Sequence, residues 1–583
     1  MELRGLPAAP GIAVGPVWRY RRGEARGIPL PDLRAAADRA SNDLLALAAR
    51  VRGLGRTDEA AIFDAQALMA TDPTLLEEAE RLARAIGVPD PDALAAAVET
   101  AARGIAETLA ALPDETLAAR AADVRDVGAR IARILAGREI ALPEQPSIAI
   151  ADDLPPSITA ELPPGSLLGI ALESGSPVSH AAILSRGLGI PSVVAVRGLL
   201  AAVDVAEAPR EAAGETGDGE TLIVTLDGEA GTLVLGPSAA QLTEIEARRE
   251  RRRRQGEAAR ALRGRPGRTA DGVAIPLLAN IGRPEDAARA LDAGAEGVGL
   301  FRTEFLFIGR SDAPSEDEQV RAYAAVLNAF GPDRPVVVRL ADIGGDKAIP
   351  YLHLAAEDNP FLGVRGLRLG YDDRALIRTQ VRAIARAGAA AGATPRLMAP
   401  MVSTFEDVTM LREIVAEALA SLDAEGTARA ARLVVGIMVE VPSAALSAPE
   451  LALEVDFFSI GSNDLTQYVL AMDRTNARLA AAADALHPAV LRAIRATVDG
   501  AGTSGIPVAV CGELAGDPLG AAVLVGLGVD ELSMDAGALD AVRLMLSRVT
   551  SADLRELAGV ALQARTATEV RAAASAVVGA AGA

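Results

Sequence analysis

The strongest constraint on the fold is a repeated alternation of short apolar runs and amphipathic segments in the C-terminal half of the sequence. A short apolar run predicts a buried strand, and an amphipathic segment predicts a helix that covers it. Eight such units favour a closed (β/α)8 barrel. A doubly wound open sheet is the alternative, but no Gly-rich dinucleotide turn supports it. The predicted strands are Ile275–Ile281, Gly297–Arg302, Pro335–Ile343, Arg365–Gly370, Arg396–Val402, Leu433–Pro442, Phe457–Asp464 and Pro507–Glu513.

Charged and amide side chains accompany most of these predicted strands. Barrel enzymes build their sites at the carboxyl ends of their strands, so we expect these side chains to converge there. One arginine is more often part of a surface ion pair, but several at one rim indicate a bound anion such as phosphate. The residues concerned are Arg302, Arg339, Arg365, Glu440, Asn463, Asp464, Arg474, Cys511 and Glu513.

Four residues suggest more specific chemistry. Glu440 and Asp464 would supply two oxygen ligands to Mg2+, which takes its other ligands from water and substrate. Cys511 lies at the end of the last predicted strand and could donate a proton, although a free cysteine is more often a small buried hydrophobe. Lys347 is the single lysine of the chain. One interpretation is that this position needs a compact ammonium group to contact a phosphate or carboxylate. The other is that the lysine is there through neutral sequence drift.

The first half of the sequence has a different pattern. Residues 29–138 form amphipathic segments broken by Pro or Gly, which predicts an inserted bundle of four or five helices. Residues 1–28 and 139–237 carry short strands, which predicts an α/β domain whose first strand comes from the N-terminus. A charged helical linker at 238–263 then leads to the barrel at 264–583.

The segment Gly175–Arg186 holds a second candidate site. A turn delivers His180 to the start of an apolar helix, where free N–H groups and the helix dipole favour an anion. A histidine that carries a phosphoryl group would suit this place, and a helix-capping histidine is the alternative. The chain has three histidines, and no cluster has the spacing of metal ligands, so a zinc site is not expected.

Composition argues against several classes of protein. The net charge of −20 argues against nucleic-acid binding. Glutamates interleave the basic run Arg248–Arg254, which favours a solvated helix face over an anion-binding patch. We find no signal peptide and no apolar stretch of about 18 residues, so no membrane insertion is expected. Cys511 is the one cysteine, so no disulfide can form within the chain, and a cytoplasmic location is expected.

Together these motifs resemble enzyme I of the bacterial phosphoenolpyruvate-dependent sugar phosphotransferase system. The resemblance covers almost the whole chain. Ser176, Val178 and Ala341 depart from the usual family pattern. The segments that carry the resemblance are the Ser-His motif at 179–180, Gly299–Leu306, Asp342–Lys347, Asn359–Arg365, Phe457–Arg474 and Cys511–Asp517.

The resemblance implies an α/β phosphohistidine domain that swivels, an inserted helical domain that binds the small carrier protein HPr, and a TIM barrel that binds phosphoenolpyruvate and forms a homodimer. It implies that His180 accepts the phosphoryl group, that Thr159 positions this histidine, and that Cys511 protonates the enolate. The implied substrate-binding residues are Arg302, Arg339, Asn463, Asp464 and Arg474, the supporting residues are Arg365, Lys347 and Glu513, and the implied Mg2+ ligands are Glu440 and Asp464.

Two other interpretations stay open. One is the same chemistry in a nitrogen-regulatory phosphorelay, a branch that usually carries an N-terminal sensor domain. The other is a non-catalytic binding or scaffold relative, against which the retained acceptor, metal ligands and proton donor argue.

Overall fold

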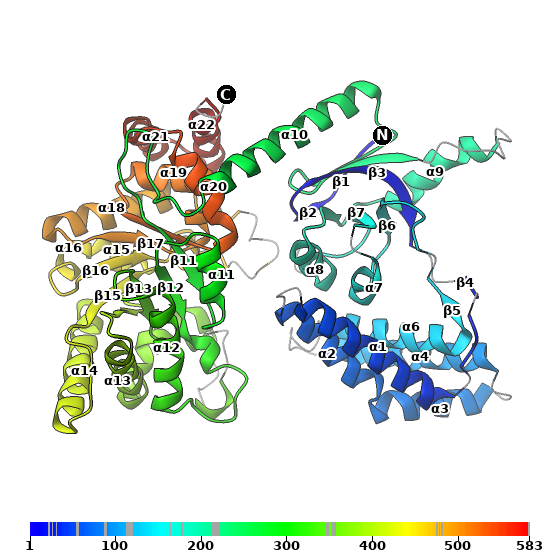
Figure 1. Ribbon diagram of the computed structural model, residues 1–583, viewed down its shortest axis with the longest axis horizontal. Coiled ribbons are helices and arrows are strands. Elements are labelled where there is room, and N and C mark those ends of the chain that lie inside the picture. The colour runs from blue at the N-terminus through cyan, green and yellow to red at the C-terminus, as the bar shows by residue number, and fades with distance from the viewer. Residues whose placement is uncertain are drawn as a thin grey trace. The chain divides into compact units, whose positions relative to one another are not determined.

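The computed structural model divides the chain into two compact units, Met1–Arg251 and Arg252–Ala583 (Figure 1). No helix among the residues described is long and apolar enough to cross a membrane. At some helix positions, His180 among them, only the backbone is described. The described residues are all except 21–23, 26, 31, 54–56, 87–89, 112–119, 141, 164, 177–178, 213–221, 346–348, 353–356, 474–475, 477–478, 480–481 and 581–583.

A bundle of helices in the first unit packs around an aliphatic core. Alanine and leucine side chains such as Ala40, Leu44 and Leu135 are completely buried. Asp90 caps one helix by accepting a hydrogen bond from Ala93 N at 2.6 Å. The helices described are α1 (Leu33–Gly53), α2 (Thr57–Ala70), α3 (Pro73–Ile86), α4 (Pro91–Ala110) and α6 (Ala121–Ala136).

The rest of the first unit is an eight-stranded sheet in the order β1-β10-β9-β3-β6-β7-β8-β2. Strand β3, from the N-terminus, pairs in parallel with β6, so the helical bundle is inserted between two adjacent strands, as the sequence predicts. The strands are β1 (Glu2–Arg4), β2 (Leu6–Ala9), β3 (Ile12–Arg19), β6 (Ser147–Ala151), β7 (Leu167–Leu172), β8 (Ser192–Val194), β9 (Ile223–Asp227) and β10 (Thr232–Leu235), with a separate ribbon of β4 (Glu24–Ala25) and β5 (Arg138–Glu139).

Three helices accompany this sheet. Helix α8 (His180–Leu188) is the helix predicted after the Ser-His motif, whereas α7 (Pro156–Glu161) and α9 (Leu199–Ala212) were not predicted. Leu184 of α8 is completely buried in the core of the inserted helices. The Ser157 hydroxyl of α7 donates to Asp126 of α6 at 2.8 Å, and both residues are buried. The insert and the α/β part therefore share apolar and polar contacts.

The charged segment after the sheet forms the long helix α10 (Ala239–Ala261). Ala259 is its only buried residue, so the arginines and glutamates of this helix face solvent, as the interleaved charges predict. The sequence predicts domain boundaries on either side of this helix, and these remain predictions.

The second unit contains a closed barrel of eight strands, which confirms the predicted fold class. Every neighbouring pair is parallel, and β18 closes the barrel against β11. The strands are β11 (Leu277–Ile281), β12 (Val298–Arg302), β13 (Val336–Arg339), β14 (Arg396–Ala399), β15 (Val434–Val439), β16 (Phe457–Ile460), β17 (Val508–Val510) and β18 (Glu531–Met534).

One predicted strand was wrong and another was missed. Residues Gly366–Tyr371 form a 3-10 helix, η4, because Gly366 has φ +60°, which a strand does not accept. The eighth strand is β18 instead. Consequently Glu440 follows the fifth strand of the barrel, Asp464 follows the sixth, and Cys511 follows the seventh, one place earlier than predicted.

Helices cover the outside of the barrel, and their apolar faces join the outward-facing strand residues in one core. Three of them, α12, α14 and α21, begin with a reciprocal capping box. These helices are α11 (Asp286–Asp292), α12 (Glu316–Phe330), α13 (Arg374–Ala391), α14 (Phe405–Ala424), α15 (Pro442–Leu446), α16 (Ala448–Leu451), α17 (Ser462–Leu470), α18 (Pro488–Ser504), α19 (Pro518–Gly526), α20 (Leu539–Leu546), α21 (Ser551–Gln563) and α22 (Ala567–Ala580).

Candidate active site

A cavity of about 300 Å³ lies where the barrel strands end. It is lined by charged side chains from the ends of five different strands, β12, β13, β15, β16 and β17, so the convergence expected from the sequence occurs. Arg474 and Lys347 lie outside the described residues. The predicted site residues that line the cavity are Arg302, Arg339, Arg365, Glu440, Asn463, Asp464, Cys511 and Glu513.

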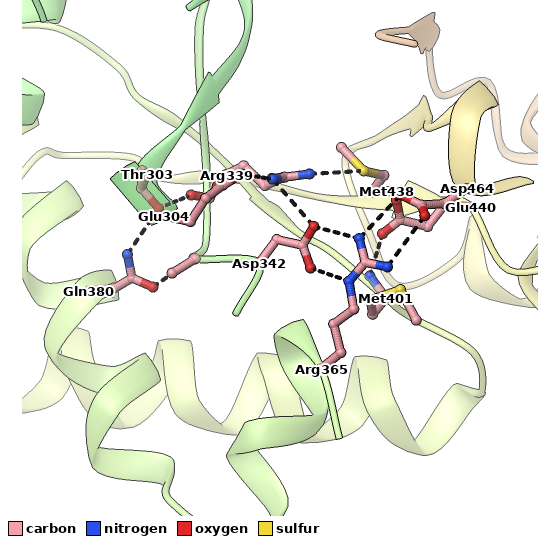
Figure 2. A network of polar contacts seen from close by, with 11 residues as sticks. Thr303, Glu304, Arg339, Asp342, Arg365, Gln380, Met401, Met438, Glu440 and Asp464 are labelled. Carbon is pink, nitrogen blue, oxygen red and sulfur yellow. Dashed lines mark hydrogen bonds and ion pairs between the residues drawn. The ribbon is translucent and has the colours of Figure 1, made fainter. Parts of the chain in front are cut away.

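Buried ion pairs connect the walls of this cavity (Figure 2). Arg339 Nη2 lies 2.6 Å from Glu304 Oε1 and 3.4 Å from Asp342 Oδ2. Arg365 donates to both oxygens of Asp342 at 2.8 Å and reaches Asp464 Oδ2 at 3.2 Å. Glu304 and Asp342 lie in segments that sequence analysis singled out, but it gave them no role. Their function is to hold the two arginines, which is a tertiary contact that no sequence motif signals.

The electrostatics of the pocket reflect these pairs. Burial alone would lower the pKa of Arg365, but the hydrogen bond and charge of Asp342 and the charge of Asp464 raise it above its ordinary value. Burial, together with the charges of Asp464 and Asp342, raises the pKa of Glu440 to about 8. The carboxylates at the strand ends are therefore not fully compensated by the arginines.

This imbalance fits a bound cation. Glu440 Oε1 accepts from Met401 N at 2.7 Å, and a Cβ on Gly461 would come within 2.8 Å of Glu440 Oε2. Glycine therefore leaves the room that this carboxylate needs. No group of three or more His, Cys, Asp or Glu side chains that could hold a metal occurs in the described part of the chain. A divalent cation at Glu440 and Asp464 would thus take its remaining oxygen ligands from substrate and water, as Mg2+ does.

The Cys511 thiol is 2% exposed at the base of the cavity. Burial raises its pKa, while the Ser459 hydroxyl and the charges of Arg339 and Arg302 oppose that shift. Asn280 Nδ2 donates to the Cys511 carbonyl at 2.9 Å and fixes the backbone of this residue. The thiol therefore keeps its proton at neutral pH, as a proton donor must.

Asn463 and Glu513 form a matched pair at the rim. Asn463 Nδ2 donates to Glu513 Oε1 at 3.1 Å, and Glu513 N donates to Asn463 Oδ1 at 3.0 Å. This double contact joins the segments that follow β16 and β17. The two predicted residues therefore lie together, and Glu513 fixes the orientation of the Asn463 side chain.

The second candidate site lies in the first unit. His180 is the first residue of α8, and Ser179 caps the helix by accepting from Ala182 N at 3.4 Å. Thr159 is 3% exposed, and its hydroxyl has no hydrogen-bond partner among the described residues. A buried hydroxyl without a partner is costly, so Thr159 is poised to bond another polar group.

Comparison with known families agrees with this arrangement. The model described as "PEP-utilising enzyme, N-terminal" matches residues 4–120, "PEP-utilising enzyme, mobile domain" matches 143–231, and "PEP-utilising enzyme, PEP-binding domain" matches 256–551. The candidate cavity falls within the last of these segments.

Curated relatives resemble the chain over nearly its whole length. A phosphoenolpyruvate-protein phosphotransferase of Geobacillus stearothermophilus is 38% identical, over 97% of this chain and 96% of the relative. One of Streptomyces coelicolor is 40% identical, over 99% of both. A multiphosphoryl transfer protein of Xanthomonas campestris is 45% identical, and the chain spans only 66% of that longer protein. The chain therefore belongs to the PEP-utilising enzymes and, among them, to the phosphoenolpyruvate-protein phosphotransferases.

Proposed function

We propose that this enzyme transfers the phosphoryl group of phosphoenolpyruvate to its own His180 and then to a histidine of the carrier protein HPr, and that pyruvate is released. This would be the first step of sugar uptake by a phosphotransferase system. The observation that carries the proposal is the cavity in which Arg302, Arg339 and the carboxylates of Glu440 and Asp464 meet. Arginines suit a phosphate and a carboxylate, and the two acidic residues suit Mg2+.

The reaction divides into phosphoryl transfer and carbon protonation. Arg302, Arg339 and the predicted ligand Arg474 would hold the phosphate while the imidazole of His180 attacks phosphorus. The P–N bond forms, the P–O bond breaks, and its electron pair stays on the enolate oxygen. A bound Mg2+ would neutralise charge on the substrate oxygens. The Cys511 thiol would then give its proton to C3 of the enolate, and the thiolate would regain a proton from water.

His180 must meet two partners in this scheme, the substrate in the barrel and the carrier. We therefore propose that the α/β domain swivels between two docking positions, and that the inserted helices recruit HPr. A homodimer formed through the barrel and a cytoplasmic location belong to the same proposal. A crosslink that fixes the α/β domain on the barrel should permit the first transfer and block the second.

Labelled phosphoenolpyruvate tests the proposed function. With Mg2+, the full chain should acquire phosphate that is stable to base and labile to acid, and should pass it to HPr. His180→Ala should acquire none. His487→Ala is the matched control, because this histidine caps α18 through its bond from Ala489 N, and it should label normally. Label retained in His180→Ala would reject the assignment of the acceptor.

A further inference from the structure

A buried chain of polar side chains lies behind the strand ends that carry Arg302 and Arg339. Its centre is Gln380, a residue of the outer helix α13 that is only 2% exposed. Figure 2 shows its amide directed at the two strand ends rather than at solvent. An amide that is buried this deeply must be fully bonded, so its contacts are informative.

Backbone groups fix the orientation of this amide. Ala341 N donates to Gln380 Oε1 at 2.9 Å, so the amide oxygen faces the end of β13. The nitrogen Nε2 then donates to Thr303 Oγ1 at 3.2 Å and to the Tyr323 hydroxyl at 3.1 Å. The Thr303 hydroxyl donates in turn to the Arg339 carbonyl at 2.7 Å. A backbone N–H can only donate and a carbonyl can only accept, so the amide cannot flip without losing bonds.

The bonds of Gln380 begin where the strand ladder stops. Strands β12 and β13 are paired as far as Arg302 and Arg339, which are partners in register. Beyond this pair, Gln380 holds Thr303, which follows Arg302 directly, and Ala341, which lies two residues after Arg339. Glu304 follows Thr303, and Asp342 follows Ala341. Both carboxylates pair with Arg339. Gln380 thus sets the spacing of two loops at the point where their charged residues enter the cavity.

We propose that Gln380 is a positioning residue of the substrate site, which holds the guanidinium of Arg339 in place through Thr303 and Ala341. This inference rests on the function proposed above for the cavity. The amide touches no substrate; it acts on the spacing of Glu304 and Asp342, and these two set the direction of Arg339. Bidentate recognition of phosphate depends on such placement, since an error of about 1 Å can reduce a rate about a hundredfold.

Substitution of Gln380 by methionine tests this role. Methionine has a similar length and suits a helix, but it makes none of the three hydrogen bonds. We expect the KM for phosphoenolpyruvate to rise about tenfold or more, with a smaller change in kcat, because the buried Ala341 N–H and the hydroxyls of Thr303 and Tyr323 lose their partner. Thr303→Val should also raise KM, whereas Thr303→Ser, which keeps the hydroxyl, should have the KM of wild type. In the double variant of Thr303→Val and Gln380→Met, the two effects on KM should not be additive in free energy.

Tyr323→Phe is the matched control. It removes one bond of the same buried amide but leaves the bonds to Thr303 and Ala341 intact. A purely structural role would make the tyrosine and glutamine variants similar, with reduced stability and an unchanged KM. If Gln380 positions Arg339, Tyr323→Phe should lose stability but keep its KM within about twofold of wild type, whereas the KM of Gln380→Met should rise by about tenfold or more. An unchanged KM in Gln380→Met would overturn the proposal.

Amide hydrogen exchange separates this inference from the proposed function, because it needs no turnover. The segment that contains Ala341 should exchange faster in Gln380→Met than in wild type, and it should be unchanged in Tyr323→Phe. If wild type fails to consume phosphoenolpyruvate, the proposed function is wrong, and this measurement still decides whether Gln380 holds the strand ends. Equal exchange in all three proteins would overturn the positioning role.

Discussion

Arg365 and Asp342 form an ion pair with two hydrogen bonds, Nε to Oδ1 and Nη2 to Oδ2, both of 2.8 Å, and each side chain is 1% exposed. The pair joins the loop after β13 to the segment that leads into η4. Because it is buried, its geometry must be maintained by both partners, and the loss of one leaves the other a buried charge with weaker compensation.

Asp342→Asn should therefore destabilise the second unit by about 3–5 kcal/mol, since Arg365 and Arg339 both lose a carboxylate. Urea unfolding followed by circular dichroism would measure this change. The first unit contains the single tryptophan, Trp18, whose fluorescence should report a transition that does not shift. Arg374→Ala, which breaks an exposed pair with Glu413, is the control and should cost less than about 1 kcal/mol. Equal losses in the two variants would contradict the prediction.

Gly461→Ala should weaken metal binding while the barrel stays folded. The new Cβ would lie 2.8 Å from Glu440 Oε2 and 3.0 Å from Glu440 Cβ, so the carboxylate must move. We expect the Mg2+ concentration for half-maximal activity to rise about tenfold or more, as for other changes beside metal ligands. Gly502→Ala in α18 meets nothing within 4 Å and should bind Mg2+ as wild type does. A wild-type Mg2+ requirement in Gly461→Ala would argue against Glu440 as a ligand.

The apolar periodicity was sufficient to predict a barrel but not its register. Leu367 and Leu369 are two residues apart and buried, as in a strand, yet they belong to the 3-10 helix η4. Nothing in the local sequence pattern distinguishes a strand from this 3-10 helix, because the positive φ of Gly366 is a property of the folded backbone. Strand β18 has the sequence Glu-Leu-Ser-Met, with two separated apolar residues and no β-branched or aromatic side chain, so it lacks the apolar run by which the other short strands were recognised.

The same limit applies to the site. Residues directly after a strand, such as Glu440, could be found because the barrel itself brings such positions together. The role of Gln380 could not be predicted, because in the sequence of an outer helix a buried glutamine cannot be distinguished from a solvent-exposed one. Its role depends on the distance between α13 and two strand ends, and that distance is a property of the packed barrel.

Leu68→Asp should impair onward transfer to HPr but leave His180 phosphorylation unchanged. Leu68 lies on α2, one of the inserted helices proposed to recruit HPr, and it is 76% exposed, so its loss should not disturb the core. A charge in an apolar contact should weaken the complex by at least about tenfold. Val205→Asp, at an equally exposed position on α9, is the control. Normal transfer rates in both variants would remove the support for docking on α2.

Asp126 should make the stability of the first unit depend on pH. Burial raises its pKa, while the charge of Arg130 and hydrogen bonds from Ser157 oppose the shift. The pKa of Asp126 in the folded protein lies above its value of about 4 in the unfolded chain. The stability that protonation contributes is therefore fully present below a pH of about 4, and it is lost as the pH rises through the folded pKa. Asp126→Asn resembles the protonated form. Its advantage over wild type should therefore be largest near pH 7 and should shrink toward pH 4.

The unfolding of this unit can be followed by the fluorescence of Trp18, at each pH and in both proteins. A free-energy difference between Asp126→Asn and wild type that stays constant from pH 4 to pH 7 would show that the pKa of Asp126 is the same in the folded and unfolded protein, and would contradict the prediction.

Cys511→Ser should separate the two halves of the proposed reaction. The buried thiol carries a raised pKa and therefore a proton at neutral pH, and Cys511 lines the cavity together with Arg339 and Glu440. A serine hydroxyl is a much weaker acid, so pyruvate formation should slow by about 100-fold or more, whereas substrate binding should change little. Enolpyruvate would then leave the site and become pyruvate in water. In deuterated water with a C3-labelled substrate, wild type should protonate one face and the variant should give racemic label. Retained facial selectivity in Cys511→Ser would show that another group is the acid and that the thiol is only packed.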